Sequence, residues 1–217
     1  GTDYLLMREE FRELADKKPP WRDPPERALV TFGGSDMNNA TPTAVRAFDG
    51  FDLSVDVIIG PGFGNEDEIE KAASETDAGF NLLKDPDDLP RRMFDADLAV
   101  SATGSTVYEL LATGTSVIGI PQTDNQVPIS EVLSSREAIV APCVEGTRSV
   151  SEKLVASSPP ELIEYDIAET KSQLKQALSE LITDSDFRRK LRDRGMSLVN
   201  AKGSERVYDS IRQAGRQ

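Results

Sequence analysis

The 217-residue sequence contains no histidine and a single cysteine, Cys143. Histidine is the usual general base, because its unperturbed pKa lies near neutrality. Any catalysis must therefore use carboxylates or a base from outside this chain. One cysteine without histidine cannot supply the usual zinc ligands, so we expect neither a metal site nor a cofactor. A lone cysteine also excludes an intrachain disulfide, which is typical of a reducing compartment, and we expect a cytoplasmic protein.

Long apolar runs and a basic surface are also lacking. The longest apolar stretches, such as 57–59 and 117–120, are far shorter than the roughly 20 residues that span a bilayer, so we expect no membrane span. A formal net charge of −13 and a pI near 4.5 argue against nucleic acid as a partner, because phosphate backbones need a basic face. The acidic excess and the preference for arginine over lysine resemble halophilic proteins adapted to high salt; an ordinary acidic protein is an equally weighted alternative.

Short apolar segments alternate with segments of helical length. Most of the apolar segments are continuous, as in strands that are covered on both faces. The strands are expected at 28–32, 53–59, 79–83, 98–101, 116–120 and 138–141, and the helices between them at 41–48, 66–73, 87–94, 105–112 and 127–134. This order predicts an α/β fold with a doubly wound, parallel, six-stranded, Rossmann-like sheet.

Both ends of the chain fall outside this alternation. Residues 1–27 join an amphipathic stretch (Tyr4, Leu5, Phe11, Leu14) to the segment KKPPWRDPP, which predicts a connector helix and a proline-rich linker. Residues 28–217 would form one α/β domain that includes extra C-terminal helices. These helices are expected at 167–182, 186–198 and 204–211, after an irregular loop at 143–160.

The stretch VTFGGSDMNN, at 30–39, directs attention to the loops after the strands, where open parallel sheets bind their ligands. Four such loops combine glycine with short polar residues: GGSD at 33–36, GPGF at 60–63, SATGST at 101–106 and PQTDNQ at 121–126. Small residues leave backbone amides accessible, and two of the loops open helices whose free first-turn amides would attract an anion. The alternative for each loop is a capped helix start, with Ser35 and Asp36 or Ser105 as capping residues.

The familiar phosphate fingerprints are absent. GGSDMN does not match G-x-G-x-x-G, and no lysine between Lys18 and Lys71 can complete a Walker loop, so NAD and ATP chemistry are disfavoured. The i,i+4 spacing places Glu109 on the same helical face as Ser105, where its carboxylate could accept hydrogen bonds from two vicinal hydroxyls such as those of a ribose. The alternative is a solvated Glu109 that only supports its own helix dipole.

These motifs carry a resemblance to a known family. GGSD, GPG, GSTVYE and DNQ resemble, in order, the C-terminal nucleotide-binding half of two-domain glycosyltransferases of the GT-B fold. Within that group the chain most resembles the UDP-sugar hydrolases of pseudaminic acid synthesis and their relatives in spore coat polysaccharide biosynthesis. YLLMREEF at 4–11 resembles the connector and MSLVNAKGSERV at 196–207 the closing helix pair, whereas 144–165 departs from the pattern.

The resemblance implies UDP or a UDP-sugar as ligand and a role for each matching residue. The diphosphate would lie against Gly33, Gly34, Ser35, Gly104, Ser105 and Thr106. Glu109 would bind the ribose hydroxyls, the backbone of Leu83 and Lys84 would meet the uracil, and Asn125 and Gln126 would face the sugar.

In the resembled hydrolases the catalytic base belongs to the N-terminal half. We therefore expect this chain to need such a half, in cis or in trans, and to be inactive alone. It would be the UDP-sugar-binding half of a hydrolase or glycosyltransferase in surface polysaccharide or nonulosonic acid biosynthesis. The alternative is a non-catalytic nucleotide-binding or assembly module, in which the arginine-rich segment RRKLRDRG at 188–195 docks a partner or is simply a solvated helix. Sugar-nucleotide 2-epimerisation is a third, less favoured option.

Overall fold

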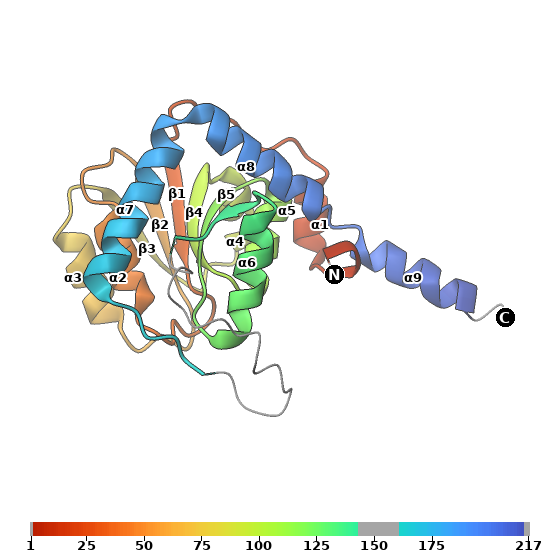
Figure 1. Cartoon of the computed structure of the whole chain (residues 1–217), viewed down its shortest axis with the longest axis horizontal. Coiled ribbons are helices and arrows are strands. Elements are labelled where there is room, and N and C mark those ends of the chain that lie inside the picture. Colours follow the sequence, from red (N-terminus) through yellow and green to blue (C-terminus); the bar gives the residue numbers. More distant parts are fainter. Residues whose placement is uncertain (1, 143–160, 215–217) are drawn as a thin grey trace.

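A computed structural model of the chain describes residues 2–142 and 161–214. Six parallel strands form one sheet, in the order β3-β2-β1-β4-β5-β6 (Figure 1). The strands are β1 (Arg27–Thr31), β2 (Ser54–Ile59), β3 (Gly79–Lys84), β4 (Leu98–Ala102), β5 (Ser116–Ile120) and β6 (Ile139–Val140). The predicted α/β class and the doubly wound parallel sheet are confirmed.

The helices between the strands also lie where the periodicity predicts them, with ends that differ by one or two residues. They are α2 (Ala40–Ala47), α3 (Glu66–Ser74), α4 (Leu89–Asp95), α5 (Ser105–Thr113) and α6 (Val127–Ser135). The strand order reverses between β1 and β4, which are neighbours although two strands separate them in the sequence. This reversal is the place where loops diverge and leave a crevice outside the carboxyl ends of the strands.

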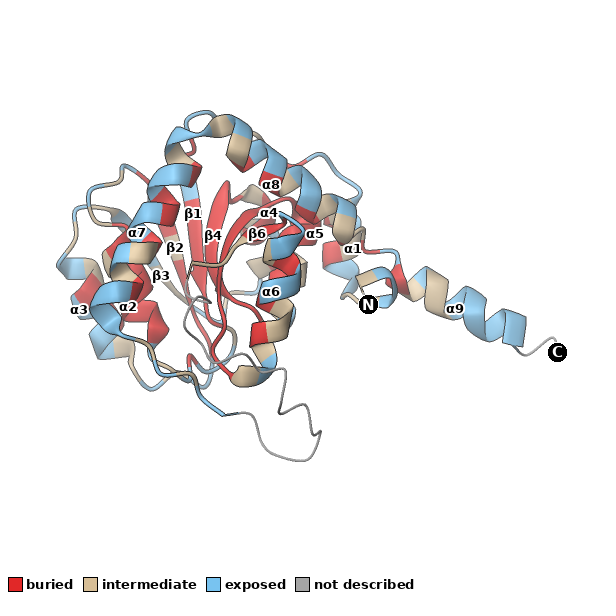
Figure 2. Cartoon of the chain, in the orientation of Figure 1, coloured by how far each residue is buried: buried red, intermediate tan, exposed pale blue. Residues whose placement is uncertain are grey.

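Each face of the sheet has its own core. On one face, Val30, Val57 and Val100 pack with α2, α3 and the C-terminal helices. On the other face, Leu29 and Ala99 pack with α4, α5, α6 and the N-terminal helix. Buried residues occupy the central strands on both faces (Figure 2), which explains why the strands are continuous apolar runs.

The N-terminal stretch divides into two elements. A 3-10 helix, η1 (Thr2–Tyr4), leaves Tyr4 55% exposed, whereas α1 (Glu9–Ala15) packs against α4 and α5 and buries Phe11 and Leu14. The predicted amphipathic stretch is thus divided between two elements, because residues 5–8 are not helical. The buried half of α1 forms part of the core formed by α4 and α5.

The C-terminal helices are α7 (Ile167–Thr183), α8 (Ser185–Leu198) and α9 (Gly203–Ala214). The first two lie along the sheet domain, and α9 projects away from it (Figure 1). Within residues 2–142 and 161–214, no helix has both the length and the apolarity that crossing a bilayer requires. The loop predicted at 143–160, with Cys143, falls outside the described residues.

Arginines of α8 hold the proline-rich segment. The guanidinium carbons of Arg188, Arg189 and Arg192 lie 4.7, 4.8 and 4.5 Å from the centre of the Trp21 ring. Arg188 is fully buried and its Nη2 donates a hydrogen bond to the Arg22 carbonyl oxygen at 2.9 Å. Neither a solvated helix nor a free docking surface describes Arg188, because the tertiary fold covers it with the linker.

Candidate functional site

The GGSD loop follows β1 directly and faces open space. Gly33 has φ +74°, a left-handed conformation that glycine adopts readily. A Cβ added at Gly33 or Gly34 would meet no atom within 4 Å. The backbone conformation therefore explains glycine at Gly33, but no steric contact in the fold explains glycine at Gly34. Room above this loop is what the sequence prediction of a ligand site requires.

The GPG loop supports the GGSD loop. A Cβ at Gly60 would lie 2.5 Å from the Gly33 carbonyl oxygen and 2.7 Å from that of Gly34, closer than real Cβ contacts. The Gly62 amide donates a hydrogen bond to the Gly34 oxygen at 2.8 Å. Close packing between loops explains Gly60, in contrast to the open surface at Gly34.

The start of α2 is already occupied by a carboxylate. Asp36 is buried, its Oδ1 accepts from the Ala40 amide at 2.8 Å, and its Oδ2 accepts from the Thr41 amide at 3.0 Å. The Asn65 side-chain amide also donates to Oδ2, at 2.8 Å. The expectation of free first-turn amides is therefore wrong at this helix, because its own chain fills the anion position. The N-cap residue of α2 is Asn39, so the expectation of Ser35 or Asp36 at that position is wrong; Asp36, three residues earlier, accepts the first-turn hydrogen bonds, and Ser35 is exposed.

The start of α5 differs. Gly104 is the N-cap residue, and no side chain caps this helix. Ser105, expected as a possible N-cap, is instead the first helical residue, followed by Thr106, and Ser105 is exposed. First-turn amides without a side-chain acceptor, together with the positive end of the helix dipole, favour an anion. Of the two helix starts singled out in the sequence, only α5 keeps this property.

β1 and β4 bring these two loops together. The strands pair in parallel register from Ala28 with Leu98 to Thr31 with Ser101, so they reach the same edge of the sheet side by side. The loop at 33–36 follows β1, and the loop at 103–106 follows β4. The two predicted diphosphate loops are thus neighbours at the point where the strand order reverses.

The DNQ motif forms a short 3-10 helix, η2 (Asp124–Gln126), beside the same edge. The Gln126 Nε2 lies 3.5 Å from the position that a Cβ of Gly104 would occupy, and its Oε1 accepts from the Gln122 amide at 2.9 Å. Asn125 is exposed, but its Oδ1 accepts a hydrogen bond from the Thr123 hydroxyl at 2.6 Å. Gln126 therefore borders the start of α5, whereas the Asn125 side chain is tied to its own turn.

Leu83 and Lys84 end β3, the outermost strand, two strands away from β1. The outer side of an edge strand carries backbone N–H and C=O groups that pair with no neighbouring strand. The predicted uracil contact would use backbone groups of this kind. The Lys84 ammonium pairs with the Glu66 carboxylate, and this hydrogen bond raises the pKa of Lys84.

Glu109 lies on α5 with its side chain only 20% exposed. Burial raises the pKa of its carboxyl, and the neighbouring Arg8 guanidinium opposes that rise. The Arg8 Nη2 lies 3.3 Å from the Glu109 Oε1. Glu109 is therefore half-buried, beside the contact of α1 with α5, and is not a fully solvated side chain. Sequence reasoning missed Arg8, since no motif or spacing connects residues 101 positions apart.

Asn38 was also missed. Its side-chain amide donates to the Gln122 carbonyl oxygen at 2.5 Å and to the Ile163 carbonyl oxygen at 3.0 Å. Thr123 pairs with Leu162 in an isolated antiparallel bridge. The first loop, the loop after β5 and the segment at 161–163 are thereby joined. This segment ends the stretch that departs from the resembled family, and it borders the candidate site.

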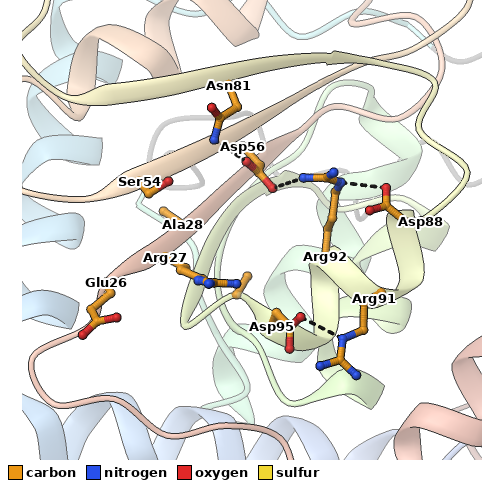
Figure 3. A pocket seen from close by; sticks show the side chains of 11 residues that line it. Glu26, Arg27, Ala28, Ser54, Asp56, Asn81, Asp88, Arg91, Arg92 and Asp95 are labelled. Atoms are coloured by element: carbon orange, nitrogen blue, oxygen red, sulfur yellow. Dashed lines mark hydrogen bonds and ion pairs between the residues drawn. The ribbon is translucent and has the colours of Figure 1, made fainter.

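A separate polar cleft of about 450 Å³ lies between α4 and the sheet, towards the amino-terminal ends of β1 and β2 (Figure 3). Its charges compensate one another: Arg92 donates to Asp56 and to Asp88, both at 2.7 Å, and Arg91 donates to Asp95 at 2.8 Å. The Arg92 hydrogen bond lowers the pKa of Asp88. Because the glycine-containing loops follow the opposite ends of the strands, this cleft is not part of the candidate site.

Comparison with known proteins agrees with the fold. No family model matches the chain. Over 135 residues it is 30% identical to the protein MJ1062 of Methanocaldococcus jannaschii, a match that covers 58% of this chain and 27% of that protein. The chain thus spans about a quarter of this curated relative.

Solved structures match over most of this chain. MurG of Acinetobacter baumannii superposes with a TM-score of 0.61 at 17% identity, over 98% of this chain and 54% of that one. The spinosyn rhamnosyltransferase SpnG gives 0.56 at 16%, over 86% and 45%, and the UDP-GlcNAc 2-epimerase of Neisseria meningitidis gives 0.55 at 11%, over 88% and 45%. The chain has the Rossmann-like α/β fold of GT-B glycosyltransferases and spans about half the length of these structures.

Proposed function

We propose that this chain is the nucleotide-sugar-binding half of a GT-B protein, a UDP-sugar hydrolase or a glycosyltransferase. One observation carries the proposal: an uncapped helix start at Ser105 and an open glycine loop at Gly34 emerge side by side where the strand order reverses. Such a place presents backbone donors to an anion without supplying a competing carboxylate.

Each predicted residue has a task in this proposal. The diphosphate would receive donors from Gly33, Gly34 and Ser35 on one side and from Gly104, Ser105 and Thr106 on the other. Glu109 would accept from the ribose hydroxyls, the backbone of Leu83 and Lys84 would meet the uracil, and Asn125 and Gln126 would face the sugar. Fixed donors at the diphosphate stabilise the charge that develops on it as the bond to the sugar breaks.

UDP is the favoured nucleotide. Two proteins that share this fold were crystallised with it: the Neisseria meningitidis epimerase with UDP-GlcNAc, and TarM of S. aureus in a complex containing UDP. Their low identity to this chain makes the ligand a proposal here. Hydrolysis, the pseudaminic acid or spore coat type of pathway and a cytoplasmic location rest on the motif resemblance alone.

A second half would complete the protein, in cis or in trans. Without histidine, this chain lacks the usual general base, so a partner half would supply it. Exposed apolar side chains near the two ends of the described chain support this idea: Leu6 is 68% exposed and Ile211 on the projecting α9 is 66% exposed, and Tyr4 and Tyr208 are 55% and 60% exposed. We expect the present chain to bind a nucleotide without turning over a sugar nucleotide.

Titration calorimetry of the purified chain with UDP, and with CMP as a matched control, tests the proposal. We expect UDP to bind at micromolar to submillimolar concentration and CMP to bind at least tenfold more weakly. A folded chain that binds no UDP at millimolar concentration would contradict nucleotide binding. UDP binding without turnover, even in the presence of an N-terminal GT-B half supplied in cis or in trans, would favour the non-catalytic nucleotide-binding module.

A further inference from the structure

Arg8 lies between the connector and α5 and contacts a residue on each side. It is the residue before α1, and its guanidinium carbon lies 4.8 Å from the centre of the Phe11 ring. Phe11 is fully buried in the core that contains Leu110 and Leu111 of α5. The packing of α1 therefore places Arg8 beside α5, where its Nη2 lies 3.3 Å from the Glu109 Oε1.

Arg8 supplies the countercharge for Glu109. The Glu109 side chain is 20% exposed, and desolvation disfavours its ionised form. Helix α5 also packs against α4 and α8. Among the described residues, however, the charge that opposes the effect of burial comes from Arg8 on α1, and no charged group of α4 or α8 contributes.

This contact leaves Glu109 able to bind a ligand. An ionised carboxylate has two oxygens with about four lone-pair positions, and it can only accept hydrogen bonds. The contact joins one guanidinium nitrogen to Oε1, and Glu109 has no other side-chain hydrogen bond among the described residues. A pair of vicinal hydroxyls needs a carboxylate that is ionised and held in one direction, and Arg8 favours both conditions.

We propose that Arg8 is a positioning residue of the nucleotide site, which orients Glu109 towards the ribose 2′- and 3′-hydroxyls of a nucleoside diphosphate. This inference rests on the proposed function. It makes ribose recognition by α5 depend on the connector that precedes α1. Arg8 acts through Glu109 and is not assigned a contact with the ligand.

Binding of UDP and of 2′-deoxy-UDP to Arg8→Ala, measured by calorimetry, separates positioning from a general effect. The wild type should prefer UDP by about tenfold, because a hydrogen bond to a charged group is lost in the deoxy ligand. Arg8→Ala should bind UDP about tenfold more weakly and show nearly equal affinity for the two ligands. Arg8→Lys should recover part of the preference, since it keeps the charge but not the planar guanidinium.

The pH dependence provides a second readout. Without Arg8 the pKa of Glu109 should rise further, so Glu109 should become protonated at a higher pH. As the pH is lowered, the affinity of Arg8→Ala for UDP should therefore begin to fall at a higher pH than that of the wild type. Arg12→Ala is the matched control, because Arg12 lies on α1 and, within the described part of the chain, its side chain makes a surface ion pair with Glu205, at 3.9 Å. We expect this control to keep the wild-type preference and pH profile.

The possible results are distinguishable. Equal weakening of both ligands by Arg8→Ala, with the wild-type ratio and pH profile retained, would overturn positioning through Glu109. Unchanged binding would overturn it as well. If the wild type binds UDP without preferring it to the deoxy ligand, this inference fails and nucleotide binding stands. A wild type that binds neither ligand would contradict the proposed function itself, and with it this inference.

Discussion

Two helix starts, those of α2 and α5, follow the neighbouring strands β1 and β4 and have opposite electrostatic surroundings. At α2 the buried carboxylate of Asp36 accepts hydrogen bonds from the Ala40 and Thr41 amides. At α5 the N-cap is Gly104 and no side chain takes that place. The same topological position thus serves stability in one helix and remains open for an anion in the other. The predictions below test this difference, the loops beside it and Glu109 on α5, from the largest expected effect to the smallest.

Removal of the buried cap should have the largest effect. Asp36→Ala leaves the Ala40 and Thr41 amides without their acceptor and removes one of the two hydrogen bonds of the Asn65 side chain, and we expect a loss of about 2–4 kcal/mol in the free energy of unfolding. Ser105→Ala at α5 is the matched control and should change it by less than about 0.5 kcal/mol. Urea denaturation measures both. Equal losses in the two variants would remove the distinction between the helix starts.

Glycine substitutions compare the supporting loop with the open one. Gly60→Ala forces a Cβ to within 2.5 Å of the Gly33 oxygen, and we expect a destabilisation of about 1–3 kcal/mol. Gly34→Val adds a side chain where no atom lies within 4 Å, so thermal unfolding should be nearly unchanged. The same variant should weaken UDP binding about tenfold or more by filling the ligand space, roughly 1.4 kcal/mol. Retained UDP affinity in Gly34→Val would show that the open space is not used.

Glu109→Gln tests the ribose assignment. The loss of a charged acceptor should weaken UDP binding about tenfold. The effect of Glu109→Gln on the free energy of unfolding should depend on pH. Burial raises the folded-state pKa above the ordinary value of 4.5, so ionisation of Glu109 lowers wild-type stability as the pH rises through that range. Glu109→Gln lacks this loss, so the stability difference should shift in favour of the variant as the pH rises above the ordinary carboxyl pKa of 4.5. Denaturation curves at several pH values check the sign.

Salt should have the smallest effect. With a net charge of −13, screening of repulsion between carboxylates should raise the midpoint of wild-type thermal unfolding by a few degrees between about 0.1 and 1 M KCl, where the Debye length falls from about 10 to 3 Å. The loss of unfolding free energy caused by Asp36→Ala should stay constant over this range of salt, because the Asp36 carboxylate is buried and its hydrogen bonds act over a short distance. Calorimetric scans measure both quantities. A midpoint that does not rise would favour an ordinary acidic protein over adaptation to high salt.

The sequence identified most of the elements and the loops that follow them. Continuous apolar runs, together with glycine and short polar residues after the strands, depend on local periodicity and turn chemistry. Pairing across the chain has no such local signal. Arg8 and Glu109, or Asn38 and Ile163, meet only because distant segments pack together. The sequence likewise suggested anion sites at both helix starts, and it left the cap assignments of Asp36 and Ser105 open.

The sequence by itself determined the α/β class, the order of strands and helices, and the absence of a histidine base. These properties depend on residue type and on short-range spacing. Only the tertiary structure decided which glycine supports a loop and which leaves space, as Gly60 and Gly34 show. It also decided that Asp36 fills one helix start while the other remains uncapped. Both outcomes depend on what lies within a few ångströms of a given atom, and packing between residues distant in the sequence sets those distances.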